Sequence, residues 1–192
     1  MRKLATLFSD SYHEFKHVRT ITTAAMFAAI SIVLGYFTIV IGDYIKIGFS
    51  TISNQFVYYL FGPVVGGLFG GALDLLKFIV KPTGVYFPGW TFGAMLAGVL
   101  YGIFLYKKPI NFWRILAAEF VVSLVCNVLL GTLWLDIMYA KGFLALFPLR
   151  ATKNLVMWPI NSMLFYSIGK TLEASGIFRI IRNFRMVGAG SR

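Results

Sequence analysis

Three polar residues precede a long apolar segment in the last third of the chain. Arg150, Lys153 and Asn154 lie within residues 148–154, directly before the apolar stretch 155–168. Residues three and four positions apart share one face of a helix, so these side chains would point the same way. A guanidinium fork and an ammonium group suit carboxylates. The group is therefore either an interfacial anchor for lipid headgroups or a recognition site for an anionic solute.

Other side chains that could contact such a solute lie in or beside apolar runs. Asp74 and Lys77 are three apart inside one run, where charged groups either pair with each other or contact a solute. Asn127 is a polar amide in the middle of another run and needs a partner there. The loop 81–90 is rich in aromatic residues, which form either a membrane-interface belt or a stacking wall for a flat ring.

The composition predicts an all-α membrane protein. Hydrophobic residues make up 58% of the chain and charged residues 13%, whereas soluble domains carry about 25% charged residues. Several apolar runs reach the roughly 20 residues that a helix needs to cross a bilayer. The net charge of +11 does not indicate nucleic-acid binding, because the cations lie in short flanks between apolar runs.

The sequence does not indicate an enzyme or a cofactor-binding protein. His13 and His17 lack neighbours with metal-ligand spacing, so we expect no metal site. Cys126 is a single cysteine and cannot form an internal disulfide. We find no nucleophile with a matching base and no carboxylate pair of sensible spacing. A GxxxxGK[ST] phosphate loop is also missing, so ATP hydrolysis would have to come from partners.

Cation distribution predicts the topology. The cation clusters near the N-terminus and at 107–114 are both expected in the cytoplasm, so an even number of crossings must lie between them. We therefore split the run 51–80 into two crossings at Gly62-Pro63, where proline removes a helix hydrogen bond. Both termini and twelve of the 18 cations then lie in the cytoplasm; the others are Lys46, Lys77, Lys81, Lys141, Arg150 and Lys153, at or near the outer loops. The six predicted spans are about 20–41, 51–62, 63–80, 90–106, 112–137 and 150–169.

Segments between and beside the spans have predicted roles as well. Residues 1–17 and the basic tail with Arg179, Arg182 and Arg185 are expected to lie on the membrane surface as amphipathic segments. The stretch 42–50 is expected to be an extended loop or hairpin arm that caps the outer side. Residues 138–149 are expected to form an outer loop.

Small residues are spaced for close helix packing in two places. Ala24 and Ala28, and likewise Ala25 and Ala29, are four apart, which suits a contact within the protein or with a partner helix. The glycines of GGLFGG, residues 66–71, have the same spacing and are interpreted as internal packing.

Taken in this order, the motifs make the whole chain resemble the substrate-binding S components of energy-coupling factor (ECF) vitamin transporters, and most closely the folate-specific members. The resemblance rests on the paired Ala-x-x-x-Ala, on the 61–66 turn with the glycine-rich helix and Asp74 behind it, on loop 82–89, and on 132–135 with 148–154. The family's fold implies six transmembrane helices with structured outer loops that cap a binding pocket.

The resemblance also implies a function. The protein would capture folate at the outer face of the plasma membrane and depend on a transmembrane coupling subunit and two ATP-binding subunits. Another vitamin, such as pantothenate, or a self-contained small-solute transporter are the alternatives. Ala24, Ala25, Ala28 and Ala29 match the family's docking motif for the coupling subunit. The expected substrate-binding residues are Phe49, Asp74, Lys77, Tyr86, Phe87, Pro88, Trp90, Asn127, Trp134, Arg150, Lys153 and Asn154.

Overall fold

The computed structural model describes residues 2–15, 17–41, 45–82, 85–139 and 142–176. Asp43, Thr83, Gly84, Lys141 and the predicted basic tail lie outside the described residues. Within these ranges the chain is helical apart from one antiparallel hairpin. The elements are α1 (Arg2–Phe15), α2 (Val18–Tyr36), β1 (Thr38–Ile41), β2 (Ile45–Gly48), α3 (Ser50–Val80), α4 (Pro88–Leu105), α5 (Phe112–Val122), the π-helix η1 (Ser123–Leu130), α6 (Gly131–Tyr139) and α7 (Phe143–Ala174).

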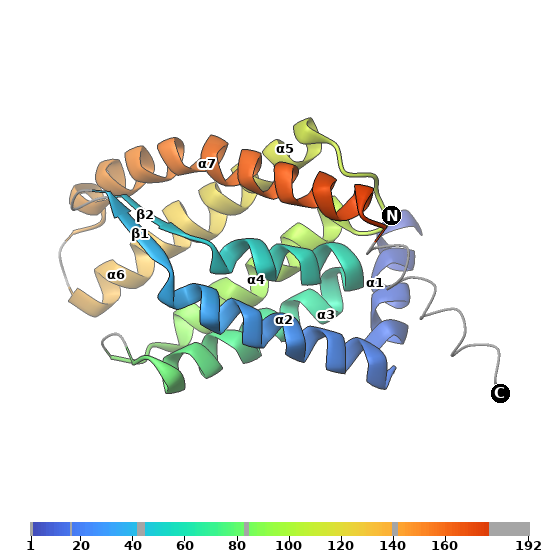
Figure 1. Ribbon diagram of the computed structural model, residues 1–192. Helices are drawn as coiled ribbons and strands as arrows, with labels where there is room; N and C mark the ends of the chain where they lie inside the picture. Colours follow the sequence, from blue (N-terminus) through green and yellow to red (C-terminus); the bar gives the residue numbers. More distant parts are fainter. Residues whose placement is uncertain (1, 16, 42–44, 83–84, 140–141, 177–192) are drawn as a thin grey trace.

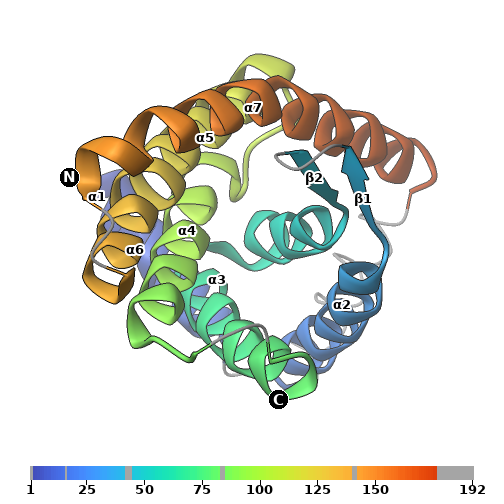
Figure 2. The same cartoon turned by 90° about the vertical axis from the view of Figure 1, so that its left-hand side faces the viewer.

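The helices surround the first half of α3. Figure 1 shows α7 along one side of the molecule and α2 along the opposite side, with α1 crossing one end and the hairpin at the other. Seen from the hairpin end, α2, the second half of α3, α4, the α5–α6 stretch and α7 form a ring around the beginning of α3 (Figure 2).

Within the described residues, four helical stretches are long and apolar enough to cross a membrane, namely α2, α3, α4 and the continuous stretch Phe112–Tyr139. Three boundaries differ from those predicted, namely the end of α2 and both ends of α7, which extends to Ala174 rather than to about 169. The first helix ends at Tyr36 rather than near Ile41, because Thr38–Ile41 pairs with Ile45–Gly48 in the hairpin. Helix α7 begins at Phe143, so most of the stretch expected as an outer loop is helical.

The earlier start of α7 changes the setting of Arg150. Pro148 and Arg150 lie inside the helix rather than at its mouth. Pro148 removes one main-chain hydrogen bond from α7, because proline has no N–H. The Pro148 carbonyl accepts a hydrogen bond from the Thr152 hydroxyl at 2.9 Å.

Helix α3 is interrupted where the sequence indicated. Gly62 has φ 85° and ψ −168°, which no helical residue adopts, and Pro63 follows it. A side chain at Gly62 would also come within 2.9 Å of the Tyr106 ring, so the position requires glycine for conformation and for space. The break divides α3 into a short first half and a longer, glycine-rich second half.

Ser11 of α1 satisfies the main-chain groups that the break leaves unpaired. Its hydroxyl donates to the Phe61 carbonyl at 2.7 Å and accepts from the Val64 and Val65 amides at 3.0 and 3.3 Å. The side chain is fully buried. An ion pair of 2.6 Å between Asp10 and Lys107 fastens the same helix to the turn after α4. Helix α1 therefore acts as a cap on the broken helix.

Glycines bring α3 and α4 into close contact. A Cβ at Gly66 would lie 2.8 Å from the Gly98 carbonyl oxygen, and one at Gly70 would lie 2.5 Å from that of Ala94. The predicted role of the GGLFGG segment in internal packing agrees with these contacts. The two helices can approach this closely because α3 contributes glycines at the crossing and α4 only the small residues Ala94 and Gly98.

A polar cluster joins three helices inside the apolar core. Glu119 of α5 accepts hydrogen bonds from Gln55 of α3 and, at 2.7 Å, from the Tyr101 hydroxyl of α4. All three residues are buried. A carboxylate in an apolar interior requires such partners, so the cluster fixes the first half of α3 against α4 and α5.

We predict that Ser11→Ala lowers the free energy of unfolding by about 1–3 kcal/mol, because three buried main-chain groups lose their partner. Thermal unfolding of the purified protein in detergent measures this loss. Ser9→Ala is the matched control, since Ser9 is an exposed serine on the same helix. Equal stability of the two variants would contradict a capping role for Ser11.

Candidate functional site

Arg150 lies between three helical elements near the hairpin end of the bundle. Its Nη1 donates to the main-chain carbonyl of Asn127 in η1 at 3.0 Å. The guanidinium carbon lies 5.6 Å from the centre of the Trp90 ring, at the start of α4. Among the described residues, Arg150 forms no ion pair with a carboxylate. Most of its five N–H donors therefore remain available to an anionic partner.

The other two residues of the polar group have different surroundings. The Asn154 side chain donates to the Arg150 carbonyl at 2.9 Å and accepts from the Ser123 hydroxyl at 3.3 Å. Lys153 is exposed. Asn154 therefore uses its amide to join α7 to η1, while the partly buried Arg150 directs its guanidinium toward η1 and Trp90.

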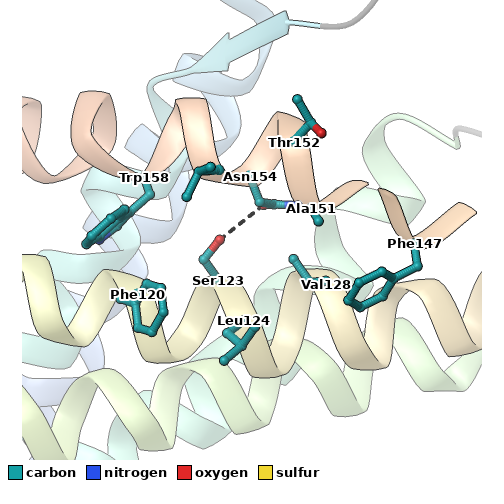
Figure 3. Close-up of a pocket in the computed structure, with 10 residues that line it drawn as sticks. Phe120, Ser123, Leu124, Val128, Phe147, Ala151, Thr152, Asn154 and Trp158 are labelled. Atoms are coloured by element: carbon teal, nitrogen blue, oxygen red, sulfur yellow. Dashed lines mark hydrogen bonds between the residues drawn. The ribbon is translucent and has the colours of Figure 1, made fainter. Parts of the chain in front are cut away.

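Figure 3 shows Asn154 and Ser123 facing each other in a pocket between α7 and η1. The pocket is lined mainly by apolar side chains from α5, η1 and α7, among them Phe120, Leu155 and Trp158. Of the expected binding residues, Asn154 alone belongs to its lining. We distinguish this pocket from the candidate site around Arg150.

Aromatic residues of the α3–α4 loop and α6 lie beside one another. The Phe87 and Trp134 rings are 5.6 Å apart and tilted by 55°. A Cβ at Gly89 would overlap both rings, so glycine lets the start of α4 approach them. Pro88 occupies the first position of α4, which proline favours. The loop thus carries Phe87 and Trp90 to the same end of the bundle as Arg150.

Two buried polar atoms in α6 lack a partner within the described part of the chain. They are the Trp134 indole Nε1 and the Thr132 hydroxyl. Buried polar groups are nearly always hydrogen-bonded, so each is suited to bond a ligand or an ordered water. Thr132 was not among the expected binding residues, although it begins the segment 132–135 that carries part of the family resemblance.

Asp74 is linked to the α3–α4 loop through Thr91. The Thr91 hydroxyl donates to the Asp74 carboxylate at 2.8 Å and lies 3.0 Å from the Tyr86 hydroxyl. Tyr86 also contacts Phe78 at 5.2 Å between ring centres. In the described structure Asp74 and Lys77 form no ion pair, so the expected alternative of a mutual salt bridge is not what holds Asp74.

Three further expectations concern side chains whose surroundings can now be described. Phe49 packs against the hydrophobic core at the start of α3, and no ring contact among the described residues joins it to Phe87 or Trp134. The Asn127 side chain is exposed, so this residue contributes its main-chain carbonyl instead of the expected amide. Neither result could be anticipated from residue type.

The four alanines of α2 face two directions. Ala28 is buried in the core and Ala24 packs against it, whereas Ala25 and Ala29 are exposed. Figure 1 shows α2 on the opposite side of the molecule from α7. The alanines therefore belong to a surface separate from the candidate site, and half of them serve internal packing.

The apolar helices define the class of the protein, which is a helical membrane protein. Residues 19–169 match the family model of the ECF transporter substrate-specific component. The chain belongs to this family, which consists of transport proteins, and this confirms both the family resemblance and the expectation that the protein is not an enzyme.

Individual relatives agree with this assignment. The folate transporter FolT of Clostridium novyi is 31% identical over 169 residues, which cover 88% of this chain and 98% of the relative. FolT of Leuconostoc mesenteroides is 29% identical over 77% of this chain and 83% of its own length. A crystal structure of FolT bound with folic acid is similar, with a TM-score of 0.72 and 29% identity, and covers 81% of this chain and 95% of that one.

We predict that Thr91→Val destabilises the protein by about 1–3 kcal/mol, because the partly buried Asp74 carboxylate loses a donor while the side-chain volume is kept. Thermal unfolding in detergent tests this expectation. Thr152→Val provides the control, since Thr152 is exposed and bonds a carbonyl of its own helix. Equal unfolding midpoints of the two variants would mean that the hydrogen bond between Thr91 and Asp74 does not contribute to stability.

Proposed function

We propose that the protein is the folate-binding S component of an ECF transporter in the plasma membrane. The observation that carries this proposal is the similarity to FolT, extending over 95% of a chain whose crystal structure holds folic acid. The setting of Arg150 supports it, because a guanidinium without an acidic partner among the described residues suits the carboxylates of folate.

The chemistry of the candidate site suits the two ends of folate. The pterin is flat and could stack on Phe87, Trp90 or Trp134. Its donor-rich edge needs acceptors, for which the Asp74 carboxylate is the best candidate. The glutamate carboxylates would bind Arg150, with Lys153 adding attraction from the surface. Tyr86, Pro88 and Lys77 would shape the loop side of the site, and Phe49 the hairpin side.

The proposed topology has six crossings, with both termini in the cytoplasm and the hairpin end outside. It is supported by the break in α3 at Gly62, which allows that helix to count as two segments, and by the positive-inside rule. The same orientation would expose Arg150 and the aromatic loop to solutes outside the cell.

A transmembrane coupling subunit and two ATP-binding subunits are the proposed partners. The chain contains no phosphate loop, so the energy for uptake would come from these subunits. The exposed face of α2 is the candidate docking surface, because Ala25 and Ala29 would let a partner helix approach closely. Ala24 and Ala28 would act indirectly by seating α2 against α3.

Titration of the purified protein with a panel of vitamins tests the binding function. We expect tight, stoichiometric binding of folic acid, and we expect Arg150→Ala to weaken it by roughly 2–5 kcal/mol, because a buried carboxylate would lose its cation. Arg114→Ala is the control, since Arg114 also bonds a main-chain carbonyl but lies at the start of α5. Preference for another vitamin, such as pantothenate, would refute the folate assignment.

Bulky residues on the exposed face of α2 test the docking surface. We expect the double variant Ala25→Leu/Ala29→Leu to lose assembly with the coupling module and to bind folic acid normally, because the close helix approach is blocked. Ala72→Leu is the control, as Ala72 is exposed on α3. Co-purification measures assembly. Full assembly of the double variant would exclude the exposed face of α2 as the docking surface. Folate uptake without the coupling module would favour a self-contained transporter.

A further inference from the structure

The π-helix η1 contacts the guanidinium of Arg150. Residues Ser123–Leu130 form this wider turn inside the otherwise α-helical stretch that begins at Phe112. Such π segments are rare and occur frequently at functional sites. Here the main-chain carbonyl of Asn127, in the second half of η1, accepts the hydrogen bond from Arg150 Nη1 at 3.0 Å.

Gly131 makes room for the same guanidinium. A Cβ at this position, the first residue after η1, would overlap Nη1 of Arg150. Gly131 is buried and has ordinary helical dihedral angles, so its conformation does not demand glycine. The structure therefore gives a steric reason for glycine here, and that reason is Arg150.

Trp90 limits the guanidinium on another side. Its ring centre lies 5.6 Å from the guanidinium carbon, a distance typical of a cation–π contact. The Asn127 carbonyl uses one of the five donors, and the planar fork cannot rotate without losing that bond or moving away from the ring. The remaining donors are thus held in a fixed direction.

We propose that Gly131 and the Asn127 carbonyl form a cradle that orients Arg150 for a carboxylate of the solute. Gly131 is a positioning residue, and the proposal rests on the proposed function for the identity of that solute. An arginine without this cradle would have to be ordered when the solute binds, which lowers affinity. The cradle is predicted to matter for carboxylate-bearing ligands and not for neutral ones.

Two ligands separate this role from a general structural one. The purified protein is titrated with folic acid and with a folic acid derivative in which both glutamate carboxylates are amides. Gly131→Ala is expected to weaken folic acid binding by roughly tenfold or more, because small displacements of a binding group are costly. Affinity for the diamide should stay within about twofold of the unmodified protein, because this ligand offers Arg150 no carboxylate.

Two control proteins complete the experiment. Gly93→Ala adds the same methyl group to α4, where nothing lies within 4 Å of it, and should change neither affinity. In an Arg150→Ala background, Gly131→Ala should cause no further loss of folic acid binding, because the group it displaces is gone. Thermal unfolding midpoints of all variants are measured in parallel.

Three results would overturn the cradle. Gly131→Ala could bind folic acid as well as the unmodified protein does. It could lose folic acid and the diamide equally, which would indicate a structural role. It could also remain harmful without Arg150. Failure of the unmodified protein to bind folic acid would overturn the proposed function and the cradle together, whereas the first three results leave folate binding intact.

Discussion

The fold depends on the hydrogen bonds that satisfy the main-chain groups freed by the break in α3. An apolar surrounding supplies no water to main-chain groups, so every amide and carbonyl freed by a break must find a partner in the protein. Gly62-Pro63 frees groups on both sides of the break, and the single hydroxyl of Ser11 bonds three of them. These hydrogen bonds allow the first half of α3 to lie inside the ring of helices, where Gln55 forms hydrogen bonds with Glu119 and Tyr101.

The second half of α3 then determines where the candidate site forms. Its glycines hold α4 close, and α4 in turn presents Trp90 to Arg150 and Thr91 to Asp74. Each expected binding group is thus carried by a regular helix or by the loop at the start of one. A site built in this way keeps its geometry better than one built on free loops, which suits tight binding of a small solute.

Side-chain pattern was sufficient to predict the helical class, the break at Gly62 and the glycine contacts, because each has a direct physical cause in residue type. The side-chain pattern did not predict the interactions that main-chain groups make. The carbonyl of Asn127 binds Arg150, and no side-chain argument anticipates that. The π-helix is a shift in hydrogen-bond register without a sequence signal, and most of the loop expected at 138–149 is helical because α7 begins at Phe143.

The alanines show a further limit of spacing arguments. Two pairs with the same four-residue spacing, offset by one residue, lie about 100° apart around a helix, since a turn takes 3.6 residues. In α2 one pair packs against the core while the other remains exposed. Spacing left internal packing and a partner helix open, and the family resemblance assigned all four alanines to the docking motif. Burial separates the two pairs, because a helix at the surface of a bundle uses one face to pack within the protein and can offer only another face to a partner.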